Sequence, residues 1–213
     1  MDTKAAAVFF DMDGVIVDSE QYWVEYETEQ VFPAIEESVA IEEITGMNVE
    51  DLYEYLDREY TLSIGRAAFL DLYDEGARQV YRAADPMPRV EEILAGIESP
   101  IGLVTSSPRR WIDIVFKRFD LHDAFDVVAS AEEVERGKPA PDVYQRAASE
   151  LAVEPTDCLA IEDSTNGVRA ASQSDMTVVA YGDPTEEAIS TADEVVKNGD
   201  ELLTTLRKQG VSS

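Results

Sequence analysis

The sequence is poor in the residues from which proteins build disulfides and zinc sites. Among its 213 residues are one cysteine, Cys158, and one histidine, His122. A single cysteine excludes an internal disulfide and a zinc site made of cysteines. Cys158 lies in an apolar run, which favours a small core residue over a nucleophile. His122 precedes a predicted strand in a loop, so we assign it no catalytic role.

Basic residues are also scarce. The chain has 17 lysines and arginines against 45 acidic residues, a formal net charge of −28. This charge argues against nucleic acid and anionic membranes as partners. Molar salt would screen the self-repulsion, which indicates a salt-loving source organism; an unusually acidic protein from an ordinary cell is the alternative. Because 45% of the residues are hydrophobic, a disordered acidic chain is excluded.

Long apolar runs are missing as well. We find no signal peptide, transmembrane segment or lipidation motif. The sequence therefore predicts a cytoplasmic protein, either a monomer or a small homo-oligomer. Its length suffices for a sizeable core, in one domain with an insertion or in two small domains.

Short apolar runs alternate with helical patterns along most of the chain, which predicts an α/β protein with a parallel sheet. The expected strands are residues 5–10, 100–105, 125–129, 157–161, 177–181 and 194–197. From residue 20 to 84 the pattern is helical only, in four segments: Glu20–Phe32, Ile35–Ile44, Val49–Tyr60 and Ser63–Arg82. This block predicts a helical cap, residues 19–84, inserted into a core of residues 1–18 and 85–213.

Polar side chains follow the apolar strands. Asp11 and Asp13 follow the first strand, Thr105 and Ser106 end the second, and Glu162 and Asp163 end the fourth, while Lys138 lies in a loop after the third. Ends of parallel strands lie side by side. Carboxylates there suit Mg²⁺, and hydroxyls, a helix start and an ammonium suit phosphate oxygens. Asp-x-Asp-Gly alone is equally typical of a turn; the partners favour a phosphate-ester site.

The chain resembles the haloacid dehalogenase superfamily of hydrolases, in the helical-cap subgroup that includes phosphoglycolate phosphatase and β-phosphoglucomutase. Four motifs carry the resemblance in the family's order: FFDMDGVIVDSE, LVTSS, GKPAPDVY and AIEDSTNGV. The resemblance spans nearly the whole chain. It implies a three-layer, Rossmann-like core and a reaction on a small phosphorylated metabolite.

The resemblance also implies roles for individual residues. Asp11 is the expected nucleophile and Asp13 the expected acid and base. The expected Mg²⁺ ligands are Asp11, the backbone carbonyl of Asp13, Asp163 and Glu162, the last directly or through water. Thr105, Ser106 and Lys138 are expected to hold the phosphoryl group. Arg109 is a candidate substrate contact, although such arginines are commonly solvated helix residues.

Three other functions are compared with that of a phosphatase: a dehalogenase, a mutase and a non-catalytic binding module. True dehalogenases lack an acid at the position of Asp13, so phosphoryl transfer is favoured. In β-phosphoglucomutase a histidine occupies the position of Trp23, and a lysine and an arginine occupy those of Thr45 and Val49. Their absence favours a phosphatase acting on a sugar phosphate or a phosphoglycolate-type substrate, with a mutase as the alternative. A non-catalytic binding module is the remote alternative.

Overall fold

A parallel sheet of six strands lies at the centre of the protein. The computed structural model describes residues 4–39 and 41–212. The strands lie in the order β3-β2-β1-β4-β5-β6, so the chain builds outward from β1 first on one side and then on the other. Their bounds are β1 Ala7–Phe10, β2 Ile101–Thr105, β3 Val127–Ser130, β4 Cys158–Glu162, β5 Thr177–Tyr181 and β6 Glu194–Val196. The predicted α/β class with a parallel sheet is confirmed.

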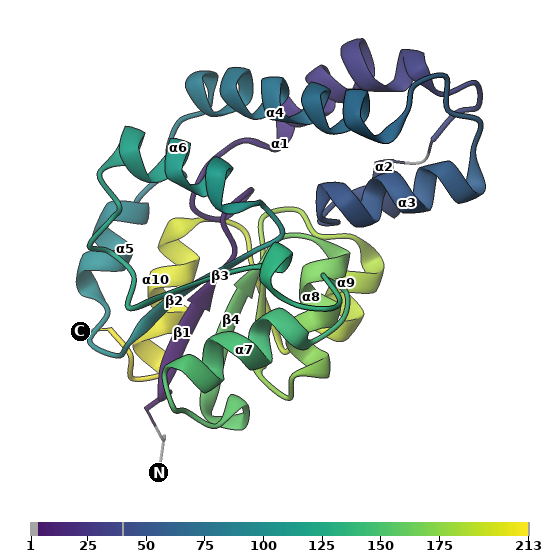
Figure 1. The fold of residues 1–213 in the computed structure, drawn as a ribbon. Coiled ribbons are helices and arrows are strands. Elements are labelled where there is room, and N and C mark those ends of the chain that lie inside the picture. Colours follow the sequence, from purple (N-terminus) through teal and green to yellow (C-terminus); the bar gives the residue numbers. More distant parts are fainter. Residues whose placement is uncertain (1–3, 40, 213) are drawn as a thin grey trace.

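Helices cover both faces of the sheet (Figure 1). Side chains of β1 alternate between the faces: Ala7 and Phe9 belong to the apolar cluster under α7 and α8, and Val8 and Phe10 to the cluster under α5 and α10. Burial on both faces explains why β1 is a continuous apolar run. The helices of the core are α5 Val90–Gly96, α6 Arg109–Phe119, η3 Ala131–Glu133, α7 Asp142–Glu150, η4 Pro155–Asp157, α8 Thr165–Gln173, α9 Glu186–Thr191 and α10 Gly199–Lys208.

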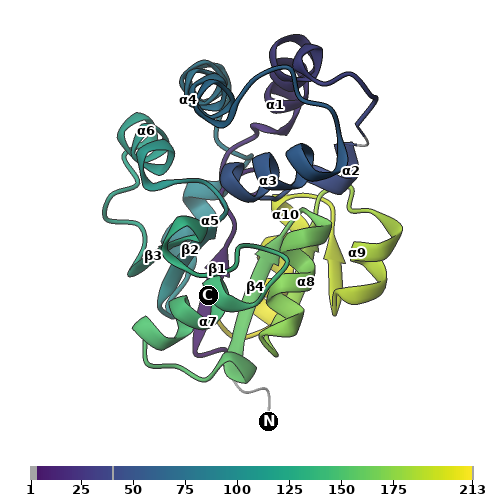
Figure 2. The ribbon, with the colours of Figure 1, turned by 45° about the vertical axis from the view of Figure 1, so that its right-hand side comes forward.

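The segment between β1 and α5 is helical and lies over the carboxyl ends of the strands (Figures 1 and 2). We call residues 19–84 the cap segment, and its boundary with the core stays a proposal. Its elements are α1 Glu20–Tyr26, the π-helical turn η1 Glu27–Val31, the 3₁₀ turn η2 Phe32–Ala34, α2 Ile41–Ile44, α3 Val49–Glu59 and α4 Arg66–Ala83. Asn48 caps α3 by accepting hydrogen bonds from the amides of Glu50 and Asp51.

The predicted helix Ile35–Ile44 is wrong over its first half. Ile35 forms an antiparallel bridge with Leu62, and the amide of Glu36 donates to the carbonyl of Thr61. Because the amide of Glu36 bonds across to Thr61, it is not available for an i to i−4 ladder. The helix begins at Ile41, and residue 40 lies outside the described residues.

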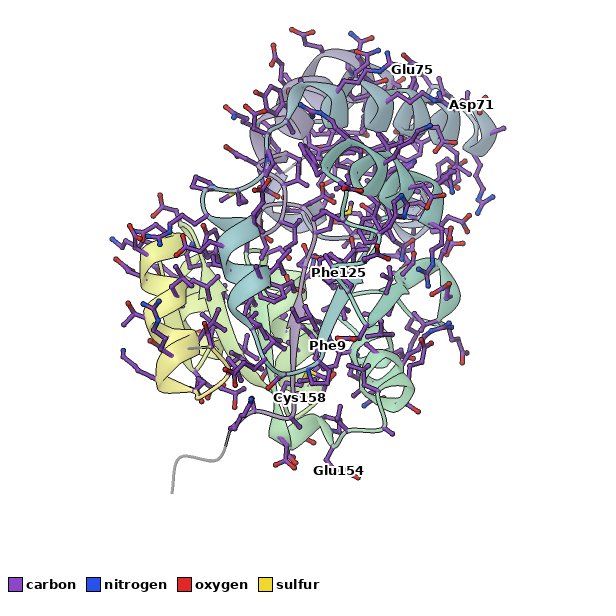
Figure 3. The ribbon with its side chains drawn as sticks, turned by 90° about the vertical axis from the view of Figure 1, so that its left-hand side faces the viewer. Phe9, Asp71, Glu75, Phe125, Glu154 and Cys158 are labelled. Atoms are coloured by element: carbon purple, nitrogen blue, oxygen red, sulfur yellow. The ribbon has the colours of Figure 1, made fainter. Side chains whose placement is uncertain are left out.

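Cys158 is a core residue, as predicted. It is 1% exposed and begins β4, at the end of the sheet opposite the cap segment. Figure 3 shows it beneath Phe9 and near Glu154, while Asp71 and Glu75 of α4 lie at the other end of the molecule. Burial also raises the pKa of the Cys158 thiol to about 11, so it is a poor nucleophile at neutral pH.

Every helix in the described part of the chain is too short or too polar to cross a bilayer.

Candidate active site

The carboxyl ends of the three central strands bring the predicted site residues together. Asp11 follows β1 directly, and its amide donates to the carbonyl of Ile161 at 3.0 Å, which holds it beside β4. One cavity, between the sheet and the cap segment, is lined by six of the eight predicted site residues: Asp11, Asp13, Thr105, Ser106, Lys138 and Asp163.

Lys138 is the buried cation of this site. Its side chain is 1% exposed, and its Nζ donates to Asp11 Oδ1 at 2.8 Å and to Glu162 Oε1 at 2.6 Å. A third bond goes to the carbonyl of Val104 at 3.0 Å. Burial works to lower the pKa of Lys138, but the carboxylates of Asp11 and Glu162 outweigh it and raise the pKa above its usual value. Lys138 is therefore a fixed positive charge at any working pH.

Glu162 lies beneath the cavity instead of on its wall. It is 0% exposed, and its Oε1 accepts hydrogen bonds from Lys138 and from the Tyr144 hydroxyl, each at 2.6 Å. Its Oε2 is buried without a hydrogen-bond partner in the described part of the chain. Tyr144 belongs to the third motif, yet its contact with Glu162 was not foreseen because it projects from helix α7.

Asp13 is surrounded by hydrogen-bond donors. Four side chains donate to its carboxylate: Ser19 at 2.6 Å, Ser107 at 2.9 Å, Tyr81 at 2.9 Å and Trp23 at 3.3 Å. Burial and the charge of Asp11 raise the pKa of Asp13, and the hydroxyl donors oppose that rise. Two of the donors, Trp23 and Tyr81, belong to cap-segment helices, so the cap takes part in holding this carboxyl group.

Thr105 and Ser106 lie where the sequence predicted them, at the end of β2. Thr105 Oγ1 accepts a hydrogen bond from the amide of Ser107 at 3.0 Å. Ser106 Oγ donates to the carbonyl of Gly46 at 2.6 Å, which ties the core to the loop after α2. The Asn166 side chain makes a similar bond to the carbonyl of Thr45 at 2.8 Å.

Arg109 is not brought to the cavity. Its guanidinium forms an ion pair with Glu133 at 2.9 Å and also donates to the carbonyl of Val128, so it faces β3 and the turn that follows. The neighbouring Arg110 pairs with Asp74 of α4 at 2.7 Å. Arg109 as a substrate contact stays a prediction, and in this structure its guanidinium is bound by Glu133 of the turn η3.

Glu20 is a cavity residue to which the sequence analysis gave no role. It begins α1 and lines the same cavity as Asp163. Enclosure in the cavity, followed by the charges of Asp13 and Asp11, raises the pKa of Glu20 to about 7. Its position inside the first motif was the only available signal.

Three carboxylates form a candidate metal centre. Asp11, Glu162 and Asp163 each offer a ligand oxygen, and these oxygens lie within 4.8 Å of one another. Burial, with the charges of Glu20, Asp11 and Glu162, raises the pKa of Asp163 well above its usual value. A hard divalent cation would relieve this repulsion and would give the unpartnered Glu162 Oε2 a ligand role. The donor set therefore fits Mg²⁺.

Two glycines leave room for these acids. A Cβ atom added at Gly14, whose φ is +72°, would lie 1.8 Å from Asp163 Oδ2. A Cβ atom added at Gly167 would lie 1.8 Å from Glu162 Oε2. Side chains at these positions would displace both candidate ligands.

Gly167→Ala is accordingly expected to raise the Mg²⁺ concentration for half-maximal activity roughly tenfold or more, by moving Glu162. Alanine alone would favour helix α8, so a loss cannot come from helix propensity. A Mg²⁺ titration of activity measures the effect. Gly65→Ala is the control, because nothing lies within 4 Å of its added Cβ. Equal Mg²⁺ curves for both variants would contradict the prediction.

Comparison with known proteins assigns this arrangement to a class and then to a family. A parallel α/β core with strand-end carboxylates beneath helices defines a hydrolase of the haloacid dehalogenase type, and the model of the haloacid dehalogenase-like hydrolase family matches residues 8–181. The chain belongs to this family. The resemblance identified from the motifs, and with it the prediction of an enzyme, is confirmed.

The similar proteins are named for two different activities, a phosphatase and a mutase. Over 186 residues the chain is 30% identical to hexitol phosphatase B of Escherichia coli, covering 84% of each chain. It is 27% identical over 224 residues to β-phosphoglucomutase of Bacillus subtilis, covering 92% of this chain and 91% of that one. A haloacid dehalogenase-like structure from Agrobacterium tumefaciens, of unknown function, gives a TM-score of 0.78 at 20% identity, covering 97% and 99% of the two chains. That last likeness shows the fold alone.

Proposed function

We propose that the protein is a Mg²⁺-dependent phosphatase that hydrolyses a small phosphate monoester through an aspartyl-phosphate intermediate. One observation carries this proposal: Asp11, at the end of the central strand, is held 2.8 Å from the buried ammonium of Lys138 and beside a second acid pair, Glu162 and Asp163. This geometry supports the proposal, because Asp11 as the nucleophile would lie next to charges that suit a phosphoryl group. Hexitol phosphatase B, a relative, agrees with a sugar-phosphate substrate.

Asp11 and Asp13 carry out the chemical steps, one as the nucleophile and the other as the acid and base. An oxygen of Asp11 attacks phosphorus, the phosphorus–oxygen bond of the ester breaks, and Asp13 protonates the leaving alcohol. Asp13 then takes a proton from water, which attacks the aspartyl-phosphate and releases phosphate. The donors around Asp13 keep its carboxyl group in one orientation for both transfers.

The remaining residues position and neutralise the phosphoryl group. Lys138 stays charged and faces Asp11, and Thr105 and Ser106 line the same cavity. Asp11, Asp163 and Glu162, with the backbone carbonyl of Asp13, would hold Mg²⁺. When bound, this ion neutralises charge on the phosphoryl oxygens.

A phosphomutase is the second candidate, since β-phosphoglucomutase is among the relatives. A mutase has to bind a bisphosphate and therefore needs a second phosphate site. Thr45 and Val49, at the positions of the mutase cations, line the cavity and carry no charge. This favours hydrolysis. Conversion of β-glucose 1-phosphate to glucose 6-phosphate without phosphate release would favour the mutase.

Hydrolysis of p-nitrophenyl phosphate tests the proposal. We expect turnover with Mg²⁺ and a fall of at least about 100-fold with a chelator, because the acid cluster then repels the phosphate. Adding Mg²⁺ back is the control and is expected to restore the rate. The assay is run in dilute buffer and in molar KCl. Absence of Mg²⁺-dependent turnover in both, across a panel of phosphate esters, would favour a non-catalytic module.

A further inference from the structure

The π-helical turn η1 directs a carboxylate of the cap segment into the active-site cavity. Glu27 is its first residue and lines the cavity together with Glu20. Its Oε1 accepts a hydrogen bond from the Tyr73 hydroxyl of α4 at 2.8 Å. The bond joins two cap helices and fixes the position of the carboxylate. Single π-helical turns commonly mark functional positions.

In the part of the chain that the structure describes, no cation near Glu27 lines the cavity to pair with a second anion. No lysine, arginine or histidine occurs in the sequence between Lys4 and Arg58. Among the described residues that line the cavity, Lys138 is the one cation, and Asp11 and Glu162 already bind it. A carboxylate or second phosphate on the leaving group would therefore face Glu20 and Glu27 without a cation to pair with, which is unfavourable.

Aromatic rings form the wall beside Glu27. Trp23 is stacked on Tyr73, with ring centroids 5.8 Å apart, and lies 5.4 Å from Trp111. All three residues line the cavity. Such a wall packs against carbon–hydrogen surface, whereas the carboxylate of Glu27 needs a hydrogen-bond donor. A carbon chain that carries hydroxyl groups satisfies both.

We propose that Glu27, positioned by Tyr73, selects the leaving group: it binds a hydroxyl of an uncharged polyol or sugar phosphate and rejects substrates with a second negative charge. The inference rests on the proposed function and narrows its substrate class. It favours sugar phosphates over phosphoglycolate, whereas the sequence analysis left both substrate types open. Burial raises the pKa of Glu27 to about 7, and the hydrogen bond from Tyr73 opposes that rise.

Two substitutions separate the two halves of the proposal. Glu27→Leu removes the proposed hydrogen bond to the substrate hydroxyl, and the KM for sorbitol 6-phosphate is expected to rise about tenfold or more. The KM for p-nitrophenyl phosphate, which has no hydroxyl groups on its leaving group, is expected to change less than about twofold. Glu27→Gln keeps the shape and removes the charge. Its kcat/KM for phosphoglycolate is expected to rise about fivefold or more, with sorbitol 6-phosphate changed less than about threefold.

Glu25→Gln is the matched control, because Glu25 lies in the adjoining helix α1, is exposed and does not line the cavity. It should change no substrate by more than about twofold. If the Glu27 variants affect all three substrates equally, Glu27 is structural and the inference fails. It also fails if ethanolamine phosphate, whose leaving alcohol carries an ammonium group, binds more tightly than sorbitol 6-phosphate.

Binding without turnover separates this inference from the proposed function. Calorimetry with sorbitol 6-phosphate and Mg²⁺ compares the Asp11→Asn variant with the Asp11→Asn, Glu27→Leu double variant. About tenfold weaker binding by the double variant would support the role of Glu27 even if the wild type released no phosphate. Equal binding by the two variants would overturn it even if the wild type were an active phosphatase.

Discussion

Asp11→Asn is expected to reduce phosphate release from p-nitrophenyl phosphate by at least about 10³-fold, the scale seen when a covalent nucleophile is removed. Asparagine has the shape of aspartate, but its amide is a far weaker nucleophile. The fold should survive, because the backbone bond from residue 11 to Ile161 does not involve the side chain. Lys138 keeps Glu162 as a partner at 2.6 Å.

Initial rates at saturating Mg²⁺ measure this effect, and thermal unfolding reports on the fold. Asp18→Asn is the control: Asp18 lies in the same motif but does not line the cavity, and its change should stay within about threefold. Substrate-dependent labelling of the wild type with a phosphoryl group that survives an acid quench and is released by hydroxylamine, absent in Asp11→Asn, would identify the intermediate. Persistent turnover by Asp11→Asn, with the asparagine verified by mass spectrometry, would refute the covalent scheme.

The core of this site was predictable because its residues stand at strand ends. Apolar runs locate buried strands, and β5 was predicted with the bounds that it has, Thr177–Tyr181. Once the sheet is parallel, residues such as Asp11 and Asp163, which are far apart in the sequence, must share one edge. The positions and ends of the apolar runs therefore give both the fold class and the place of the chemistry.

The residues that the sequence did not reveal come from helices. Tyr81 and Tyr144 contact Asp13 and Glu162 from α4 and α7, and Glu27 enters the cavity from a π-helical turn. Helical periodicity tells which face is buried, but not which strand end that face meets. A tyrosine on such a face looks like an ordinary core residue until its hydroxyl partner is placed.

Local signals failed where tertiary contacts or short length decided the structure. Residues 35 to 44 show helical spacing, yet Ile35 pairs with Leu62. Helix α9, Glu186–Thr191, was missed because only Ala188 among its six residues is buried, which leaves little apolar pattern to detect. Its start is set by Thr185, whose side chain accepts from the amide of Ala188. The pairing of Arg109 with Glu133 was not foreseen, because Glu133 follows a different strand.

Lys138→Met is expected to lower the free energy of unfolding by about 3–5 kcal/mol in the absence of metal, as when one partner of a buried ion pair is removed. Methionine fills the same space, so the loss comes from leaving Asp11 and the fully buried Glu162 without their ammonium. Urea unfolding measures the effect, and saturating Mg²⁺ should recover part of it by binding the same acids. Lys117→Met, at an exposed position of α6, is the control and should stay within about 0.5 kcal/mol. Equal stability of the two variants would mean that the buried acids are already neutral, and the electrostatic basis of the proposed phosphatase would then be wrong.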